Sequence, residues 1–258
     1  MPRFSSFTAY SAICRRELRS LFISPLAWLV LSLVQLVLGV VFVIQLQIFL
    51  DPPKVSALSQ TWGVTRVIAA PVATWGAFML LLVIPVITMR GFSGEWRTGT
   101  MTLLLASPAS SATIVLAKFS ALAVFVAVQV TCIALLPLLL LIGSKLDSGL
   151  LLSQYLGLTL AGSLFAAFGL LISSLTRQPA VAAAGTFGLL FVSWLLSWRG
   201  PNTGTSAQEW VHRMSWQLHL DPLVRGLVDS ADVLYFVIFA CTALILCIWR
   251  VSCLRRAG

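Results

Sequence analysis

Long apolar stretches alternate with short polar connections along the whole chain. Each stretch is long enough to cross a hydrocarbon core of about 30 Å as a helix that rises about 1.5 Å per residue. None alternates over about ten residues, as the strands of a membrane barrel do. The pattern predicts an all-α, polytopic membrane protein with a single transmembrane domain over residues 1–258. The six expected transmembrane helices are residues 26–50, 67–89, 119–142, 150–173, 180–198 and 233–249.

Composition supports a membrane protein and argues against nucleic acid as a partner. Charged residues make up 10% of the chain and hydrophobic residues 59%, whereas soluble domains carry about 25% charged residues. The net charge of +9 comes from residues at the ends of the apolar stretches rather than from one basic patch. The lipid bilayer is therefore the expected surrounding. The five cysteines have no metal-binding spacing.

An amphipathic helix precedes the first span, over residues 4–24. Its apolar positions recur at steps of three and four, and three arginines lie off that stripe. This period predicts a helix in the headgroup plane, whereas a merely basic flank would explain the arginines alone. Ser24-Pro25 ends the helix, because proline disfavours helical geometry in the residue before it. The stripe is Phe7, Tyr10, Cys14, Leu18 and Leu21, and the arginines are Arg15, Arg16 and Arg19.

The distribution of lysine and arginine predicts the orientation. Eleven of the seventeen basic residues lie in the two termini, in residues 90–118 and at Arg177, and six lie in the other connections. The more basic side of a membrane protein faces the cytoplasm. Both termini and residues 90–108 are therefore expected inside the cell, and residues 199–232 outside.

The external connection carries a second helix signal. Ser206 and Glu209 have capping-box spacing, and Trp210, Met214 and Leu218 form an apolar stripe behind them. We expect a short helix resting on the outer leaflet, with an ordinary interfacial loop as the alternative.

Residues 90–108 form a polar, glycine-bearing island between two apolar spans. Phe92, Trp96 and Leu103–Leu105 are apolar positions suited to seating a short helix against the inner leaflet. Glu95 and Arg97 are then expected to point away, toward a soluble protein. Gly99-Thr100 is expected to break or re-cap the helix, because threonine is a good N-cap. A segment of this kind can transmit a partner's movement to two spans, although a plain basic loop is the simpler alternative.

The chemistry absent from the spans narrows the function. No charged residue lies centrally in a span, which disfavours an ion-coupled carrier. The chain has no phosphate-binding loop, so any nucleotide hydrolysis must occur on a partner, and no cofactor is expected here. Four glutamines are candidates for a polar translocation surface, although such amides equally often join helices. These are Gln35, Gln45, Gln47 and Gln129.

Small residues recur at every fourth position in two spans. Ala180, Ala184 and Gly188 form one series, and Gly162 and Ala166 form another. Such spacing lets helix backbones approach closely. We therefore expect tight packing at these positions, either within the subunit or across a dimer; generic alanine content is the competing explanation.

Three stretches resemble the membrane subunits of ABC-2-type transporters, and most closely the branch of gliding-motility and copper-enzyme maturation permeases. The first stretch resembles the first cytoplasmic loop of that family, the second its N-terminal surface helix, and the third its entry to span six. Here Gly94-Glu95 replaces two acidic residues, and Thr102 replaces an acidic one. The matching positions are Thr88–Arg90, Phe92–Ser93, Glu95, Arg97–Thr100, Leu103–Leu105, Ser107–Pro108 and Lys118–Phe119, then Arg16–Ala27, then Arg225–Phe236.

The resemblance implies a permease subunit that works with a cytoplasmic ATPase and a second permease subunit, identical or similar. ATP and Mg would be bound by the ATPase, export is the usual direction, and the bacterial inner membrane is the expected location. Movement of the ATPase would displace residues 92–105 and the N-terminal helix. The residues that the resemblance places at this contact are Phe92, Glu95, Trp96, Arg97, Gly99 and Thr100, with Arg15, Arg16 and Arg19.

Two other functions stay open. An integral-membrane enzyme would use acidic residues and histidines of the external connection. These are Glu209, Asp221, Asp229, Asp232, His212 and His219. A non-transporting assembly factor built on the same scaffold is the other alternative.

Overall fold

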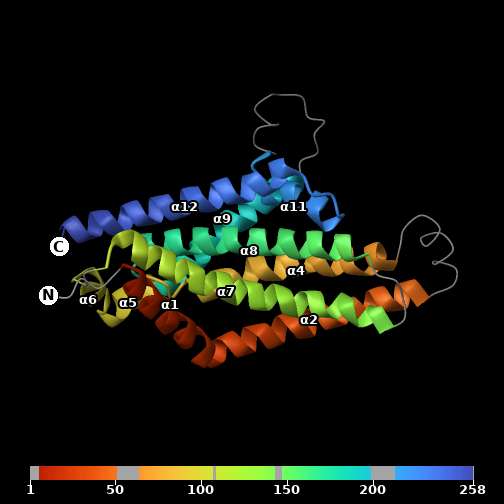
Figure 1. The fold of residues 1–258 in the computed structure, drawn as a ribbon, viewed down its shortest axis with the longest axis horizontal. Helices are drawn as coiled ribbons and strands as arrows, with labels where there is room; N and C mark the ends of the chain where they lie inside the picture. Colours follow the sequence, from red (N-terminus) through yellow and green to blue (C-terminus); the bar gives the residue numbers. More distant parts are fainter. Residues whose placement is uncertain (1–5, 51–63, 107–108, 143–146, 199–212, 258) are drawn as a thin grey trace.

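The computed structural model describes residues 6–50, 64–106, 109–142, 147–198 and 213–257. Within these residues every regular element is a helix, and the long helices run along the long axis of an elongated bundle (Figure 1). The fold class is therefore as predicted. In chain order the elements are α1 (Ser6–Ile23), α2 (Pro25–Leu50), α4 (Val64–Thr88), α5 (Ser93–Thr98), α6 (Met101–Ala106), α7 (Ser111–Leu138), η1 (Leu139–Ile142), α8 (Ser148–Leu175), α9 (Pro179–Leu195), η2 (Leu196–Trp198), α11 (Trp216–Val224) and α12 (Ser230–Ala257).

The predicted spans correspond to α2, α4, α7, α8, α9 and α12. In the described part of the chain, all but α9 are long and apolar enough by themselves to cross a membrane. α9 has 17 residues and continues into the 3-residue helix η2. At about 1.5 and 2.0 Å per residue the pair reaches about 31 Å, close to the thickness of a hydrocarbon core.

The third span begins earlier than the sequence suggested. The expected start was residue 119, but α7 begins at Ser111 because Ser110 caps it: the Ser110 side chain accepts a hydrogen bond from the Thr113 N–H at 3.1 Å. An N-cap of this kind satisfies one of the free N–H groups in the first turn. Lys118, placed in the connection by its charge, therefore lies within the helix.

α8 forms the centre of the bundle. It packs against α4, α7, α9, α11 and α12, and it is the most buried of the long apolar helices, whereas α2 and α12 are the least buried. A Cβ added at Gly162 would meet Val126 Cγ1 at 2.5 Å, and Ala166 is fully buried. The predicted close approach at this small-residue pair is confirmed, and it is made between α8 and α7.

The N-terminal helix α1 crosses the bundle obliquely and meets α2 at a sharp elbow (Figure 1). Ser24 separates the two helices, and Pro25 occupies the first position of α2, where its missing N–H costs nothing. The predicted amphipathicity is confirmed, because Tyr10, Cys14, Leu18 and Leu21 are half-buried while the arginines are exposed. Its inner face packs on α7, and its location in the headgroup plane stays a prediction.

The two ends of the bundle differ. Both termini lie at one end together with α5 and α6, and α11 lies toward the opposite end (Figure 1). This arrangement matches the predicted even number of crossings.

Candidate functional site

The polar island folds into two short helices at the end of the bundle that holds the termini. Gly99 ends α5 in the left-handed region, with φ of 73°, and its N–H donates to the Trp96 carbonyl at 3.3 Å. The Leu104 N–H then donates to the Thr100 carbonyl at 3.1 Å, as α6 begins. The predicted break at Gly99-Thr100 is confirmed. It depends on glycine, which adopts positive φ without a Cβ clash.

The start of α5 is fixed to the central helix by one serine. The backbone N–H groups of Phe92 and Ser93 both donate to Ser173 Oγ of α8, at 3.0 and 3.1 Å. The chain runs close to α8 here, since a Cβ at Gly91 would meet Leu170 at 2.8 Å. Ser173 thus satisfies two N–H groups that the first turn of a helix leaves unpaired. Nothing in the local sequence pattern indicated this role.

Four charged side chains join α1, α5 and α7 in an ion cluster, which we define as Arg16, Glu17, Glu95 and Lys118. Lys118 Nζ lies 2.9 Å from Oε1 of both Glu17 and Glu95. Arg16 Nη2 lies 2.9 Å from the same two oxygens. The cluster therefore contains two positive and two negative charges, and each carboxylate is shared between two cations.

Three of the four side chains of the ion cluster are mostly buried. The Lys118 side chain is 3% exposed, Glu95 12% and Glu17 19%, whereas Arg16 is 60% exposed. Burial by itself would raise the pKa of the Glu17 carboxyl, but Lys118 and Arg16 outweigh it and hold that pKa below its usual value. The hydrogen bond to Glu17 is the main cause of the raised pKa of Arg16. Phe92 lies beneath the ammonium group, with its ring centre 5.3 Å from Lys118 Nζ.

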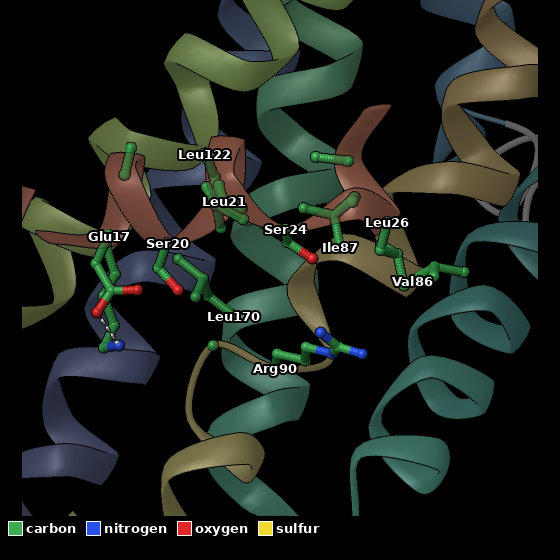
Figure 2. A pocket seen from close by; sticks show the side chains of 14 residues that line it. Glu17, Ser20, Leu21, Ser24, Leu26, Val86, Ile87, Arg90, Leu122 and Leu170 are labelled. Carbon is green, nitrogen blue, oxygen red and sulfur yellow. Dashed lines mark hydrogen bonds and ion pairs between the residues drawn. The ribbon is translucent and has the colours of Figure 1, made fainter. Parts of the chain in front are cut away.

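A small cavity of about 100 Å³ adjoins the cluster (Figure 2). It lies between α1, the elbow before α2, the end of α4, and α7 and α8. The ion pair of Glu17 and Lys118 contributes to its lining, as do Ser24 and Arg90; Glu17, Ser24 and Arg90 are labelled in Figure 2. The lining therefore places charged groups beside apolar walls.

The structure corrects the expected exposure of this segment. Glu95 does not point toward solvent, because it is held in the ion cluster. Phe92 is fully buried in the protein rather than seated on the leaflet. Trp96 is half-buried, and the centre of its ring lies 5.0 Å from Cζ of the Arg177 guanidinium group. Exposed residues at this end include Arg15, Arg16, Arg19, Arg97, Thr98, Gly99, Thr100 and Thr102.

The four glutamines do not form one surface. Gln35 donates to the Cys132 carbonyl of α7 at 3.1 Å and so joins two helices. Gln129 is fully buried, and neither of its amide atoms has a hydrogen-bond partner among the described residues. Gln45 lines a groove at the opposite end of the bundle, and Gln47 is exposed. Gln35 and Gln45 are also about 15 Å apart along α2.

The small-residue stripe of α9 faces outward. Ala180 and Ala184 are exposed, and no atom lies within 4 Å of a Cβ built at Gly188. The inner face of α9 is made instead by Ala182, Thr186 and Leu190. The prediction that this stripe packs tightly within the subunit is therefore wrong. α9 is rotated so that the stripe points away from α4 and α8.

The described part of the connection between α9 and α12 is held by hydrogen bonds. α11 is anchored to α8, since Ser153 and Gln154 donate to the carbonyls of Leu223 and Val224 at 2.7 and 2.9 Å. His219 Nδ1 lies 2.7 Å from Asp232 Oδ1, and its Nε2 lies 3.1 Å from the Arg213 carbonyl. Both ring nitrogens thus link α11 to its surroundings.

Four residues of that connection for which the sequence made predictions are not among the described residues. Ser206, Glu209, Trp210 and His212 do not fall within the described residues, so the expected capping box remains a prediction. α11 begins beyond them, after Ser215. Among the described residues, no group of three or more His, Cys, Asp or Glu side chains is placed to hold a metal ion.

Comparison with known families identifies the class of protein. Residues 11–202 match the model of the ABC-2 family transporter protein, a range that contains most of α1, all of α2 to α9, and the segment with the ion cluster. The chain belongs to this family. It is a membrane permease of an ABC transporter, a transport subunit without its own nucleotide site, and the family implies an ABC ATPase as partner.

The match is to the family as a whole and does not select a branch within it. No curated protein matches the chain.

Proposed function

We propose that this chain is the permease subunit of an exporter in the bacterial inner membrane, driven by a cytoplasmic ATPase that binds ATP and Mg. The observation that carries the proposal is the attachment of α5 to several helices at once. Ion pairs join α5 to α1 and α7, and Ser173 joins it to α8. A force on α5 would therefore reach the amphipathic helix α1 and three spans, α7, α8 and α4, the last of which leads directly into α5.

The segment has two layers with different tasks in this proposal. The outer layer is Arg97, Gly99 and Thr100 on α5–α6, with Arg15 and Arg19 on α1, and all of these residues are exposed. It would contact the ATPase. The inner layer is the ion cluster with Ser173, which would transmit the movement. Glu95 thus acts as a positioning residue rather than as a contact to the partner.

The end that holds the termini faces the cytoplasm in this proposal. It carries the larger share of the basic residues, as cytoplasmic faces do, and it presents the exposed arginines to the ATPase. The groove and α11 then lie at the external face.

A second permease subunit would complete the translocation path. The outward stripe of Ala180, Ala184 and Gly188 is available for close helix contact, and α2 exposes a long apolar face. Export is the usual direction in the family that the sequence resembles, and it is therefore the proposed direction.

Matched substitutions distinguish the roles of the two layers in the complex of the full chain with its ATPase. Arg97→Glu reverses an exposed charge in the outer layer, and we expect it to weaken co-purification of the ATPase about tenfold, as loss of a charged contact worth about 1.4 kcal/mol would. Arg213→Glu makes the same change at the other end of the bundle and should leave association unchanged.

A substitution in the inner layer is expected to change ATP hydrolysis rather than association with the ATPase. Glu95→Gln leaves the outer surface intact, so the ATPase should still co-purify, but its hydrolysis should no longer respond to reconstitution of the permease in a bilayer. If Arg97→Glu and Arg213→Glu have equal effects on association, the proposed contact surface is wrong. If Glu95→Gln keeps full permease-dependent stimulation, the ion cluster does not transmit the movement.

A further inference from the structure

The cavity at the elbow between α1 and α2 has one charged lining residue that the coupling proposal does not use. The charged residues of the lining are Glu17, Arg90 and Lys118, and the cavity has a volume of about 100 Å³. A single bound water needs about 10–15 Å³, so the cavity has room for a group of the size of a phosphate. Glu17 and Lys118 are paired within the ion cluster, which leaves Arg90 without an assigned role.

Arg90 is a surplus positive charge in this lining. It follows the end of α4, is exposed, and forms no ion pair or hydrogen bond with any described residue. The ion cluster is neutral by itself, since its two cations share two carboxylates. The described protein therefore offers Arg90 no nearby carboxylate that is not already shared. The other described acidic residues lie toward the opposite end of the bundle, at the start of α8, on α11 and at the start of α12 (Figure 1); they are Asp147, Asp221, Asp229 and Asp232.

The residues around the elbow are typical of the headgroup layer of a bilayer. Trp28 in the first turn of α2 is 58% exposed, and its indole N–H donates to the Phe22 carbonyl of α1 at 2.8 Å. Tryptophans of spanning helices are enriched at the membrane–water interface. The amphipathic α1, with its exposed arginines, ends at the same elbow. A cavity among such residues suits a lipid phosphate in depth as well as in charge.

Exposed apolar surface runs from the cavity along both neighbouring spans. Leu26 of α2 lines the cavity. Leu29 and Leu33, three and seven residues further on and on the same face, are 65% and 54% exposed. Val86 of α4 also lines the cavity, and Leu82, one turn earlier, is 38% exposed. Both surfaces lead from the elbow toward the middle of the bundle, and Leu33 lies about 11 Å along α2 from Leu26. An acyl chain that starts at the cavity would therefore find apolar surface to follow.

We propose that the elbow cavity binds a glycerophospholipid, with its phosphate at Arg90 and Ser24 and an acyl chain along Leu29 and Leu82. A guanidinium group donates paired N–H groups to phosphate oxygens, and a serine hydroxyl supplies a further donor. A free phosphate ion, or an acidic side chain of the ATPase, would leave the apolar surface unused. The site does not depend on the proposed coupling, because Arg90 and Ser24 belong to neither layer of the coupling segment.

A matched pair of substitutions at Ser24 tests the charge of the cavity. Ser24 precedes Pro25, the first residue of α2, and Asp and Asn are equally good residues at this N-cap position. Ser24→Asp and Ser24→Asn should therefore both keep the elbow, but only aspartate would neutralise Arg90. Native mass spectrometry of the purified full chain in detergent, with added palmitoyl-oleoyl phosphatidylglycerol, counts the bound lipid. We expect Ser24→Asp to bind about tenfold less than Ser24→Asn, as the loss of one charged contact would cause. Equal binding by the two variants would overturn the proposal.

Arg90→Gln removes the cation itself, and Arg256→Gln is its control. Arg256 is exposed near the end of α12, at the same end of the bundle, and does not line the cavity. We expect Arg90→Gln to bind about tenfold less lipid and Arg256→Gln to bind as the wild type does. Equal loss in both would mean non-specific annular lipid and would overturn the proposal. Full lipid binding by Arg90→Gln would overturn it as well; if the ATPase no longer co-purifies with that variant, Arg90 contacts the partner instead.

The position of the acyl chain is tested by cross-linking. Phosphatidylglycerol with a photoactivatable group on one acyl chain is bound to the wild type and to Ser24→Asp, and the adducts are mapped by peptide mass spectrometry. Adducts on the peptides that hold Leu29 and Leu82 should fall about tenfold in the variant relative to adducts near Ile245, which is exposed on α12. An unchanged ratio would overturn the proposal. Displacement of the lipid by millimolar inorganic phosphate would identify a free-phosphate site and would overturn it too.

Discussion

Lys118 illustrates how a single residue changes role between sequence and structure. As a charge near an apolar stretch it served only to orient the chain. In the fold its ammonium group is almost fully buried and bound by the carboxylates of Glu17 and Glu95. Removing one partner of a buried ion pair is far more costly than losing a surface pair, because the remaining charge stays out of water. The two carboxylates therefore hold α1 and α5 to α7.

This pairing predicts a dependence on acidity. Because the pKa of Glu17 in the folded protein lies below its ordinary value of 4.5, its contribution is complete above that value and is lost as the pH falls through the lowered pKa. Hydrogen exchange, corrected for intrinsic rates, should show steady protection of α1 amides from pH 7 to 5 and loss of protection below about 4.

The control for the acid effect is Glu17→Gln, which removes the titrating group. We expect it to weaken docking of α1 by about 1–3 kcal/mol at neutral pH and to show little further change on acidification. Identical pH profiles for this variant and the wild type would show that Glu17 does not hold α1 in place.

At the scale of elements, the break between α5 and α6 depends on one glycine. Gly99 has a left-handed backbone and open space around its Cα, so an added methyl group meets no atom within 4 Å. Any effect of a substitution there comes from the backbone conformation rather than from a clash. A left-handed L-residue costs about 1–2 kcal/mol, and a helical conformation at residue 99 would fuse the two short helices.

Gly99→Ala is therefore expected to lower the free energy of unfolding by about 1 kcal/mol and to reduce permease-dependent ATPase activity. Gly39→Ala is the matched control, since it also has no atom within 4 Å but lies inside α2, where alanine is favoured by up to about 1 kcal/mol. Thermal unfolding and ATPase assays of both variants measure the difference. Equal behaviour of the two variants would contradict a requirement for the left-handed break.

At the scale of the whole molecule, α8 is enclosed by its neighbours while α2 and α12 present apolar faces outward. The exposed side chains on these faces include Leu29, Leu36, Ile245 and Trp249. Apolar surface on this scale is stable only against lipid or another protein. The bundle therefore has a buried axis, a lipid-facing or subunit-facing surface, and two polar ends with different chemistry.

The proposed orientation of these ends is tested by labelling single cysteines, introduced into a cysteine-free chain, in intact cells. Leu227 and Thr98 are exposed at opposite ends of the bundle. A membrane-impermeant maleimide should label Leu227→Cys directly and Thr98→Cys only after the cells are permeabilised. The reverse pattern would invert the topology and place the segment beyond the reach of a cytoplasmic ATPase.

The sequence by itself determined the helical class, the positions of the spans, the amphipathic α1 and the break at Gly99. Each of these depends on local periodicity or on the backbone preference of one residue. Gly162 was also found in this way, although its partner helix was not.

Only the tertiary structure decided which residues of the polar island are exposed and which are paired. Glu95 and Arg16 are 79 residues apart in the chain, and Lys118 and Glu17 are 101 apart, so no local pattern relates them. The stripe on α9 shows the same limit: its spacing identifies a face of the helix, but the direction of that face follows from how α9 packs on the bundle. Helices form from local interactions, whereas their rotation and the pairing of their charges depend on the neighbours that the fold provides.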